Sequence, residues 1–202
     1  MIAILDYGMG NLKSIYNMFK KIGIKSIVTS DVEIIKNADK YLLPGVGSFD
    51  HGIYALKNAS FFKTFENEVL LHKKPLLGIC LGMQLLGNKS EEGNEQGLGW
   101  IDAETKKFNL IDKELSIPHM GWNQVHPIGH NQLFQGLVEE NRFYFVHSYH
   151  VVCHDKKDIL ATSNYGEMFT CSIHKENIYG VQFHPEKSHK FGMQLLKNFG
   201  EI

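Results

Sequence analysis

The feature that most constrains this chain is an apolar run that ends at a cysteine between two glycines. The run Pro75–Ile79 leads into Gly78-Ile79-Cys80-Leu81-Gly82, and a segment with helical propensity follows. This is the pattern of a nucleophile elbow, in which a strand turns sharply into a helix, with cysteine in the place of serine. The flanking glycines allow the turn to close where a Cβ atom would clash. The pattern therefore predicts a strand–turn–helix unit with Cys80 at the turn.

The thiol of Cys80 has two interpretations. As an elbow nucleophile, its sulfur projects from the turn, and the N-terminus of the following helix favours the thiolate. The backbone N–H of Leu81 then points toward any oxyanion formed beside the sulfur. As a structural residue, Cys80 is a buried cysteine at a strand end. The two glycines at this spacing favour the nucleophile.

The composition is that of an ordinary globular protein. The 202 residues are 43% hydrophobic and 21% charged, which fits one α/β domain or at most two small ones. Since the sequence shows no interdomain linker, residues 1–202 are expected to form a single domain. The net charge of −1 implies no general attraction to nucleic acid or to an anionic membrane. Since no apolar run approaches the roughly 18 residues of a membrane span, and Met1–Leu5 lacks the features of a signal peptide, no membrane association is expected.

The cysteines and histidines argue against disulfides and metal sites. The three cysteines form no paired framework, which indicates a reducing compartment, the cytoplasm; they are Cys80, Cys153 and Cys171. The eleven histidines and the cysteines show no zinc-ligand spacing. We therefore expect no metal and no other cofactor.

The two halves of the chain carry different secondary-structure patterns. The first half alternates strands with helices, and the second contains short strand-like pieces and a final helix. This predicts one mixed-sheet α/β domain, parallel first and antiparallel later. Strands are expected at 1–6, Ser26–Thr29, Lys40–Leu43, Lys73–Ile79, Gly99–Phe108, Arg142–Cys153, Ile159–Ser163, Phe169–His174 and Ile178–Phe183, and helices at 12–22, Gly52–Leu56, Phe61–Leu71, Leu81–Asn88 and His189–Phe199.

Two glycine-bearing loops follow predicted parallel strands. The pair Gly8-x-Gly10 fits an incomplete dinucleotide fingerprint, because Lys13 occupies the place of the third glycine; a tight β–α turn explains it as well. In Pro44–Phe49, two glycines flank one residue, so this loop either presents backbone N–H groups to a ligand or is an ordinary turn. Ligands of parallel sheets bind beyond the carboxyl ends of the strands, where Cys80 also lies.

A second chemical motif follows the last predicted strand. His184-Pro185-Glu186 comes directly after Gly180–Phe183, and Pro185 ends the strand there. Glu186 is close enough in sequence to orient the imidazole, so that with Cys80 the set comprises a nucleophile, a proton shuttle and an orienting carboxylate. The fragment alone fits a polar strand exit equally well.

Three segments together resemble the class I, triad-type glutamine amidotransferases. They are Pro44–Phe49, Gly78–Gln84 and Gly180–Glu186. Three further segments look like the glutaminase subunits of imidazole glycerol phosphate synthase, namely Asp6–Asn11, Ile117–Asn123 and Phe143–Tyr149. The resemblance covers the chain from the first strand to the last helix. It implies a flavodoxin-like α/β fold with a three-layer, mixed, mainly parallel sheet.

The resemblance also implies a mechanism and roles for individual residues. Cys80 would attack the side-chain amide of glutamine, His184 would transfer protons, and Glu186 would hold the histidine tautomer. The oxyanion would be held by Leu81 N–H and the backbone of Gly45, Val46 and Gly47. Glutamine would be bound by Gln84, Glu92, Ser148 and Tyr149; a carboxylate at position 92 suits the substrate ammonium.

The same resemblance implies a partner. The ammonia released from glutamine would pass to a TIM-barrel synthase subunit that makes imidazole glycerol phosphate and AICAR in histidine biosynthesis, in a heterodimer. Residues at the interface would include Asn11, Tyr144 and Lys187. Low glutaminase activity is expected for the isolated chain, since the peptide of Val46 would have to rotate before the oxyanion hole is complete.

Three other functions remain open. A paralogous glutaminase could supply ammonia for amidation of a surface sugar; the segment Asp102–Lys107 is more charged than the family pattern. The chain could be a stand-alone cysteine hydrolase that acts on another amide or ester. It could also be a catalytically idle subunit that only regulates a synthase, although such a subunit has no need of the complete Cys80, His184 and Glu186 set.

Overall fold

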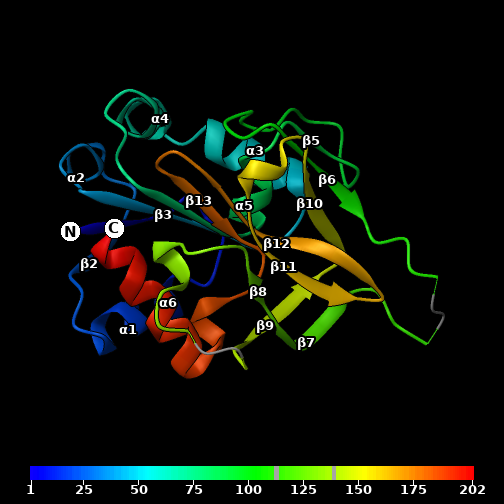
Figure 1. The fold of residues 1–202 in the computed structure, drawn as a ribbon. Coiled ribbons are helices and arrows are strands. Elements are labelled where there is room, and N and C mark those ends of the chain that lie inside the picture. The colour runs from blue at the N-terminus through cyan, green and yellow to red at the C-terminus, as the bar shows by residue number, and fades with distance from the viewer. Residues whose placement is uncertain (112–113, 138–139) are drawn as a thin grey trace.

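The centre of the protein is one long twisted sheet that changes from parallel to antiparallel along its width (Figure 1). The computed structural model describes residues 1–111, 114–137 and 140–202. The parallel half has the order β2-β1-β3-β4-β13. Its strands are β1 (Ile2–Leu5), β2 (Ser26–Thr29), β3 (Lys40–Gly45), β4 (Leu76–Cys80) and β13 (Ile178–Val181).

The antiparallel half continues from β13 into the second half of the chain. It runs through β12 (Glu167–Lys175), β10 (Tyr149–Cys153), β6 (Ala103–Lys107) and β5 (Lys89–Ser90), with β11 (Ile159–Tyr165) and β8 (His126–Pro127) joined through β12. Pairing is antiparallel from β13 to β6, and β5 is parallel to β6. The predicted mixed sheet is therefore confirmed.

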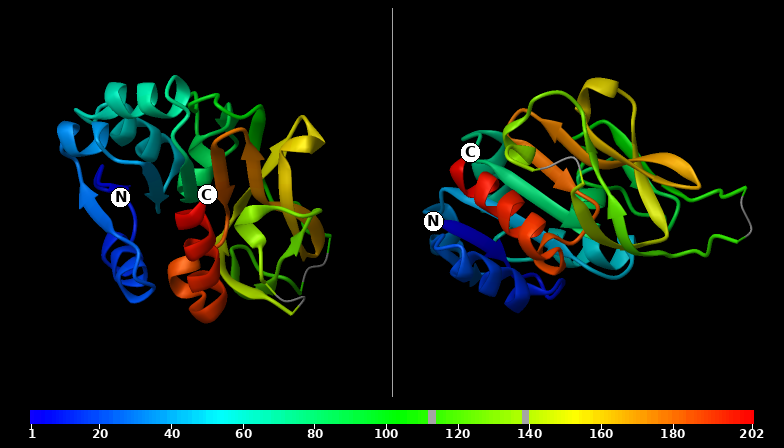
Figure 2. Two further views of the ribbon diagram at one scale, coloured as in Figure 1. Left: turned by 60° about the vertical axis from the view of Figure 1, so that its left-hand side comes forward. Right: turned by 60° about the horizontal axis from the view of Figure 1, so that its bottom comes forward.

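Helices cover both faces of the parallel half and make three layers (Figure 2). Alternate residues of β1 point to opposite faces, and they enter two different hydrophobic clusters. Ile2 and Ile4 pack with α1 (Leu12–Lys21) and α6 (His189–Glu201), while Ala3 and Leu5 lie in the cluster of the other helices. Those helices are α2 (Val32–Lys36), α3 (Phe49–Lys57), α4 (Phe62–Leu70) and α5 (Leu81–Leu85).

A separate two-stranded sheet lies beside the main one. It pairs β7 (His119–Gln124) with β9 (Arg142–His147) in antiparallel fashion. The backbone N–H of His184 donates to the carbonyl of Tyr144 at 2.8 Å, which ties this small sheet to the segment after β13. The small sheet is thereby held next to the carboxyl ends of the parallel strands.

The helix after the elbow is shorter than the predicted Leu81–Asn88. It ends at Leu85, and the backbone N–H of Asn88 instead donates to the carbonyl of Ala103 at 2.7 Å. Lys89 and Ser90 then pair with Glu104 and Thr105 of β6. Gly87 follows the C-cap Leu86, as glycine commonly does where a helix ends, and the chain then pairs with β6.

Short 3₁₀ helices complete the described chain: η1 (Gln132–Phe134), η2 (Lys156–Asp158) and η3 (Pro185–Lys187). None of the helices in residues 1–111, 114–137 and 140–202 combines the length and the apolar character needed to cross a membrane.

Candidate active site

Cys80 occupies a strained turn between β4 and α5. Its backbone angles are φ 54° and ψ −111°, which an L-residue adopts only when the surroundings enforce it. A Cβ atom on Gly82 would lie 1.9 Å from the carbonyl oxygen of Leu43, and one on Gly78 would lie 2.8 Å from the backbone of Gly82. The glycines that flank Cys80 therefore permit the close approach of strand and helix that the elbow needs.

The parallel strands bring the other motifs to the same edge of the sheet. Gly45, at the end of β3, is the register partner of Cys80. On the other side of β4, Val181 is the register partner of Ile79, and the chain continues from there to His184. Segments that are far apart in sequence thus meet around the sulfur of Cys80, as the position of ligand sites in parallel sheets predicts.

His184 and Glu186 form a buried pair at the start of η3. The Nδ1 atom of His184 lies 2.8 Å from Oε1 of Glu186, and their side chains are only 3% and 1% exposed. Ser188 Oγ donates to the carbonyl of His184 at 2.6 Å and accepts from the backbone N–H of Tyr144 at 3.0 Å. His184 is therefore fixed at its imidazole ring by Glu186 and at its backbone carbonyl by Ser188.

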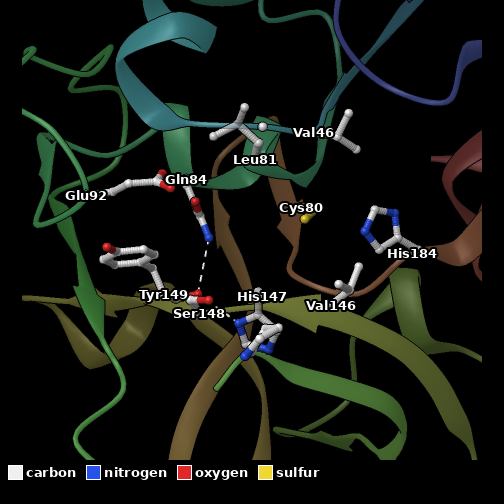
Figure 3. A pocket seen from close by; sticks show the side chains of 12 residues that line it. Val46, Cys80, Leu81, Gln84, Glu92, Val146, His147, Ser148, Tyr149 and His184 are labelled. Atoms are coloured by element: carbon white, nitrogen blue, oxygen red, sulfur yellow. Dashed lines mark hydrogen bonds between the residues drawn. The ribbon is translucent and has the colours of Figure 1, made fainter. Parts of the chain in front are cut away.

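The electrostatics favour an imidazolium beside Cys80. Burial opposes a charge on His184, but its interactions with Cys80 and Glu186 outweigh burial and raise the pKa of His184 to about 10. The ring faces the sulfur in Figure 3. Within the described chain, His184 Nε2 has no hydrogen-bond partner, so it is available to a reacting group. The pair can therefore supply a proton to a leaving group bound at Cys80.

A cavity of about 330 Å³ opens above Cys80 and His184. This volume lies at the lower end of the range of small-molecule sites, about 300–1,000 Å³. Its walls are Val46, Gly47, Cys80, Leu81, Gln84, Glu92, Pro118, Val146, His147, Ser148, Tyr149 and His184. The structure thus brings together most of the residues that the sequence predicted for one site.

Two of the predicted residues lie just outside this cavity. Gly45 is buried under the elbow, where a Cβ atom would meet the backbone N of Gly82 and the Cβ of Leu81 at 2.9 Å. Glu186 lies behind His184 and borders a second cavity, next to α1 and Lys187. Gly45 therefore supports the loop that reaches the cavity at Val46 and Gly47, and Glu186 contacts the cavity only through His184.

The polar residues of the cavity lie on one side of Cys80, opposite His184 (Figure 3). Gln84 Nε2 donates to the carbonyl of Tyr149 at 3.2 Å and to Gln182 Oε1 at 3.0 Å. Glu92 Oε2 accepts from the backbone N–H of Phe49 at 2.8 Å, at the start of α3. These contacts hold both side chains in place at the wall, and they place an anionic carboxylate at the end of the cavity away from His184.

Gln182 and His147 are site residues that the sequence reasoning missed. Gln182 is fully buried, and its Nε2 donates to Cys80 Sγ at 3.7 Å while its Oε1 accepts from Gln84. The signal for Gln182 was a polar side chain inside the otherwise apolar run Gly180–Phe183. His147 lines the cavity from the end of β9, and the sequence offered no local signal for it beyond its place in Phe143–Tyr149.

Two of the three residues expected at a partner interface, Tyr144 and Lys187, lie close to His184. Lys187 Nζ is 5.3 Å from the centre of the Tyr144 ring, and the ring of Trp122 packs against Tyr144 at 6.1 Å. Asn11 caps α1, and its side chain accepts from the backbone N–H of Ser14. The loop that contains Gly8 and Gly10 supports the neighbouring one, because the Tyr7 hydroxyl donates to the carbonyl of Pro44 at 2.6 Å.

The arrangement can carry out acyl transfer. Cys80 supplies a nucleophile at a helix N-terminus, His184 supplies a proton shuttle, and Glu186 orients it. The cavity offers the carboxylate of Glu92 to a cationic group of the substrate, and the loop around Val46 and Gly47 borders it near Cys80. A small amide or ester that carries a positive charge fits these features.

Comparison with known proteins identifies the family of the chain. The sequence matches the family described as glutamine amidotransferase class-I over residues 3–201. It is 58% identical over 199 residues to a protein of Methanococcus maripaludis named imidazole glycerol phosphate synthase subunit HisH 2, with 98% of each chain covered. It is 48% identical over 202 residues to the protein of that name from Pseudomonas aeruginosa, with 100% of each chain covered.

The fold has solved relatives as well. One crystal structure of a glutamine amidotransferase superposes with a TM-score of 0.72 at 17% identity, with 99% of this chain and 97% of that chain covered. At this identity the likeness concerns the fold alone. The family match and the full-length similarity to HisH proteins show that the chain belongs to the class-I glutamine amidotransferase family, among the HisH-type subunits.

Proposed function

We propose that this chain is the glutaminase subunit of an imidazole glycerol phosphate synthase. It hydrolyses glutamine to glutamate and ammonia, and the ammonia is used in histidine biosynthesis. The names of its full-length relatives support this function. The observation that carries it is the strained Cys80 beside the His184–Glu186 pair, in one cavity with the carboxylate of Glu92.

The reaction takes place in two stages at Cys80. The sulfur attacks the side-chain amide carbon of glutamine, and the C–N bond breaks while His184 protonates the departing ammonia. A glutamyl thioester remains on Cys80. His184, now neutral, takes a proton from water, which attacks the thioester and releases glutamate. Glu186 keeps the proton of the neutral ring on Nδ1 and leaves Nε2 free to exchange protons.

The tetrahedral intermediates require an oxyanion hole. Leu81 N–H and the backbone of Val46 and Gly47 are its components in this proposal, and Gly45 supports the loop that carries the latter two. Loss of one such donor costs about 2.7–4 kcal/mol of transition-state stabilisation. Since Val46 is exposed at the mouth of the cavity, a docked partner can act on its peptide and shift the population toward the complete hole.

The polar wall of the cavity accounts for the choice of glutamine. Glu92 binds the α-ammonium group, and the backbone at Ser148 and Tyr149 flanks the α-carboxylate. Gln84 borders the side chain of the substrate and is itself held by Tyr149 and Gln182. With its charged end at this wall, glutamine presents its amide to Cys80.

A TIM-barrel synthase subunit is the proposed partner, in a heterodimer that makes imidazole glycerol phosphate and AICAR. It docks on the outer face of β7 and β9, where Met120 is 61% exposed and Trp122 46% exposed. Tyr144 and Lys187 lie beside this apolar surface. Asn11, at the start of α1, is a further contact in this proposal. Docking there closes the cavity from solvent, so that ammonia passes to the partner before it is protonated or lost.

The proposal is tested by reconstitution with the cyclase subunit from the same organism. With glutamine as nitrogen source, the complex is expected to form imidazole glycerol phosphate, and the isolated chain to release little ammonia. Cys80→Ala abolishes the glutamine-dependent reaction and leaves the reaction with ammonium salts intact. Glutamine turnover that survives Cys80→Ala contradicts the mechanism, and high turnover by the isolated chain contradicts partner control.

The names of the relatives do not favour the alternative acceptor, a surface sugar. Growth of a histidine auxotroph that lacks its own glutaminase subunit, when supplied with this chain and its cyclase, would decide the acceptor. We further propose that residues 1–202 work as one glutamine amidotransferase domain in the cytoplasm, where the three cysteines stay reduced.

A further inference from the structure

Beneath the cavity, two buried histidines and an asparagine form a continuous chain of hydrogen bonds. His147 Nδ1 lies 2.7 Å from the carbonyl oxygen of Tyr149, and His147 Nε2 lies 2.9 Å from Nδ1 of His119. His119 Nε2 in turn lies 3.3 Å from Asn123 Nδ2, which also donates to the carbonyl of Asn164 at 2.7 Å. The chain thus connects β7 to the first residue of β10.

The two backbone carbonyls at its ends determine the direction of every bond. A carbonyl only accepts, so His147 carries its proton on Nδ1, and its Nε2 accepts when the ring is neutral. His119 must then donate from Nδ1 and accept at Nε2 from the amide of Asn123. Burial keeps both rings neutral, because it lowers the pKa of His119 to about 4 and the pKa of His147 to about 3.

The chain of bonds ends at the point where the protein crosses from one sheet to the other. β9 pairs with β7 in the small sheet, β10 pairs with β6 in the main sheet, and Ser148 lies between them. Ser148 and Tyr149 are also walls of the cavity (Figure 3). The carbonyl of Tyr149 accepts from both His147 and Gln84, so side chains fix this junction from two directions.

We propose that His119, His147 and Asn123 are positioning residues for glutamine, which hold the Ser148–Tyr149 backbone in the orientation that receives the substrate carboxylate. This inference rests on the proposed glutaminase function and concerns the binding of its substrate. None of the three side chains is required for bond breaking at Cys80. We call the hydrogen-bonded series Tyr149 carbonyl, His147, His119 and Asn123 the relay. Its loss therefore weakens glutamine binding and leaves the chemical step largely unchanged.

The test compares three phenylalanine variants in the complex with the synthase subunit. His147→Phe keeps an aromatic ring and removes both hydrogen bonds; the KM for glutamine is expected to rise about tenfold, with kcat within about twofold of wild type. His119→Phe removes the next link and is expected to raise KM about threefold. His150→Phe is the matched control, because His150 packs on Phe108 as His147 does and lies outside the relay.

Two more variants separate the relay from simple packing. In the double variant His119→Phe/His147→Phe, KM is expected to equal that of His147→Phe alone, since the relay is already broken. His147→Asn can place an amide N–H near the position of Nδ1, and it is expected to restore most of the affinity. Circular dichroism and urea midpoints monitor folding, and if His147→Phe does not fold, His119→Phe and His147→Asn supply the comparison.

Specific results overturn the inference. They are an unchanged KM in both single relay variants, multiplicative effects in the double variant, a fall of kcat at constant KM, or an equal effect of His150→Phe. Failure of the proposed function is a different result: wild-type complex that neither hydrolyses glutamine nor is labelled at Cys80 by a diazoketone analogue of glutamine. If the wild-type complex hydrolyses glutamine but the KM is the same in the relay variants, only the positioning role of the relay is contradicted.

Discussion

The Nδ1 atom of His184 lies 2.8 Å from Oε1 of Glu186, and both side chains are almost completely withdrawn from water. In the proposed mechanism the carboxylate stabilises the imidazolium of His184 before it gives up its proton, and then keeps the neutral ring in one orientation. Because Glu186 contacts the cavity only through His184, its contribution is to orientation and charge. In the proposed mechanism Glu186 therefore contributes to catalysis and not to binding of the substrate.

Replacement of Glu186 by glutamine is expected to lower kcat with little change in the KM for glutamine. The amide keeps the shape of the side chain but loses the charge, and it can stabilise the wrong tautomer of His184. General acid–base catalysis contributes about 10²–10⁴-fold, so kcat should fall by about 100-fold or more. Steady-state glutaminase assays of the complex measure both constants.

The matched control is Glu176→Gln on the β12–β13 hairpin. Glu176 is exposed and its carboxylate pairs with Lys73 across the surface, so its replacement should leave both kinetic constants unchanged. If Glu186→Gln raises KM and preserves kcat, the carboxylate serves binding, and its assignment as the orienting group is wrong.

The three thiols are expected to differ sharply in reactivity. His184 places a positive charge beside Cys80 at neutral pH, since its pKa is raised to about 10. Burial raises the pKa of Cys153 to about 12 and that of Cys171 well above its usual value, so these two remain thiols. At pH 7.5, iodoacetamide should therefore add close to one group per folded chain, at Cys80.

Intact-mass spectrometry followed by peptide mapping measures this stoichiometry. Cys80→Ala should abolish the fast labelling, and His184→Ala should slow it by about tenfold or more because the neighbouring cation is lost. In denaturant all three thiols should react, which is the internal control. Fast labelling of Cys153 in the folded chain would contradict the assignment of Cys80 as the activated thiol.

The sequence predicted the parallel half of the fold and the three side chains of the proposed triad. The strand pattern, the glycines around Cys80 and the His184-Pro185-Glu186 motif are local features that physical rules can interpret one at a time. The structure confirms the elbow turn and brings the three side chains together.

What the sequence did not show depends on contacts between distant segments. The strand β7 has no clear alternation, since Gly121 interrupts it, and its pairing with β9 defines it. The bond between His119 and His147 joins residues on two strands and becomes visible only once their register is known. Likewise, α5 ends at Leu85, and the pairing of Lys89 and Ser90 with β6 joins segments whose contact the local sequence does not show.

Gly82→Ala is expected to destabilise the protein and disable the site together. The added Cβ atom would lie 1.9 Å from the carbonyl oxygen of Leu43, where only backbone movement can relieve the clash. A loss of unfolding free energy of about 2 kcal/mol or more is expected, together with loss of glutaminase activity. Urea unfolding monitored by circular dichroism measures the first effect, and assays of the complex measure the second.

Gly200→Ala is the control for this substitution. Its Cβ atom would meet the flexible end of the Ile24 side chain, which can rotate away, in a helix far from Cys80 in sequence. The variant should keep full activity and lose little stability. Equal losses in the two variants would mean that the elbow tolerates a Cβ atom at Gly82 as well as a peripheral helix does at Gly200.

The last prediction concerns stability at acidic pH, and it follows from His119 and His147. Burial lowers their pKa values in the folded protein to about 4 and about 3, below the unfolded value near 6.5. Below pH 6.5 the unfolded chain therefore binds protons that the folded chain does not, so stability falls as pH decreases toward 4. Each histidine contributes a slope of at most about 1.4 kcal/mol per pH unit.

The other titratable groups near His119 and His147 either disfavour protonation of these rings as well or lose their own effect on stability only above pH 6.5. His119, His150 and His184 each disfavour a proton on His147, and the imidazolium of His184 is present throughout the acidic range. The raised pKa of His184 makes its own contribution complete below pH 6.5 and lost only as pH rises toward 10. The slope between pH 6.5 and 4.5 thus reports mainly on the buried neutral histidines.

Urea unfolding at pH 7.0, 6.0 and 5.0 measures this slope. The variants His119→Phe and His147→Phe lack one titrating ring each, so their stability should depend less steeply on pH than that of the wild type, even where they are less stable at pH 7. His51→Phe is the control, because His51 is exposed on α3 and should leave the slope unchanged. If all four proteins lose stability in parallel, these histidines are not held neutral by the fold, and the directional relay loses its electrostatic basis.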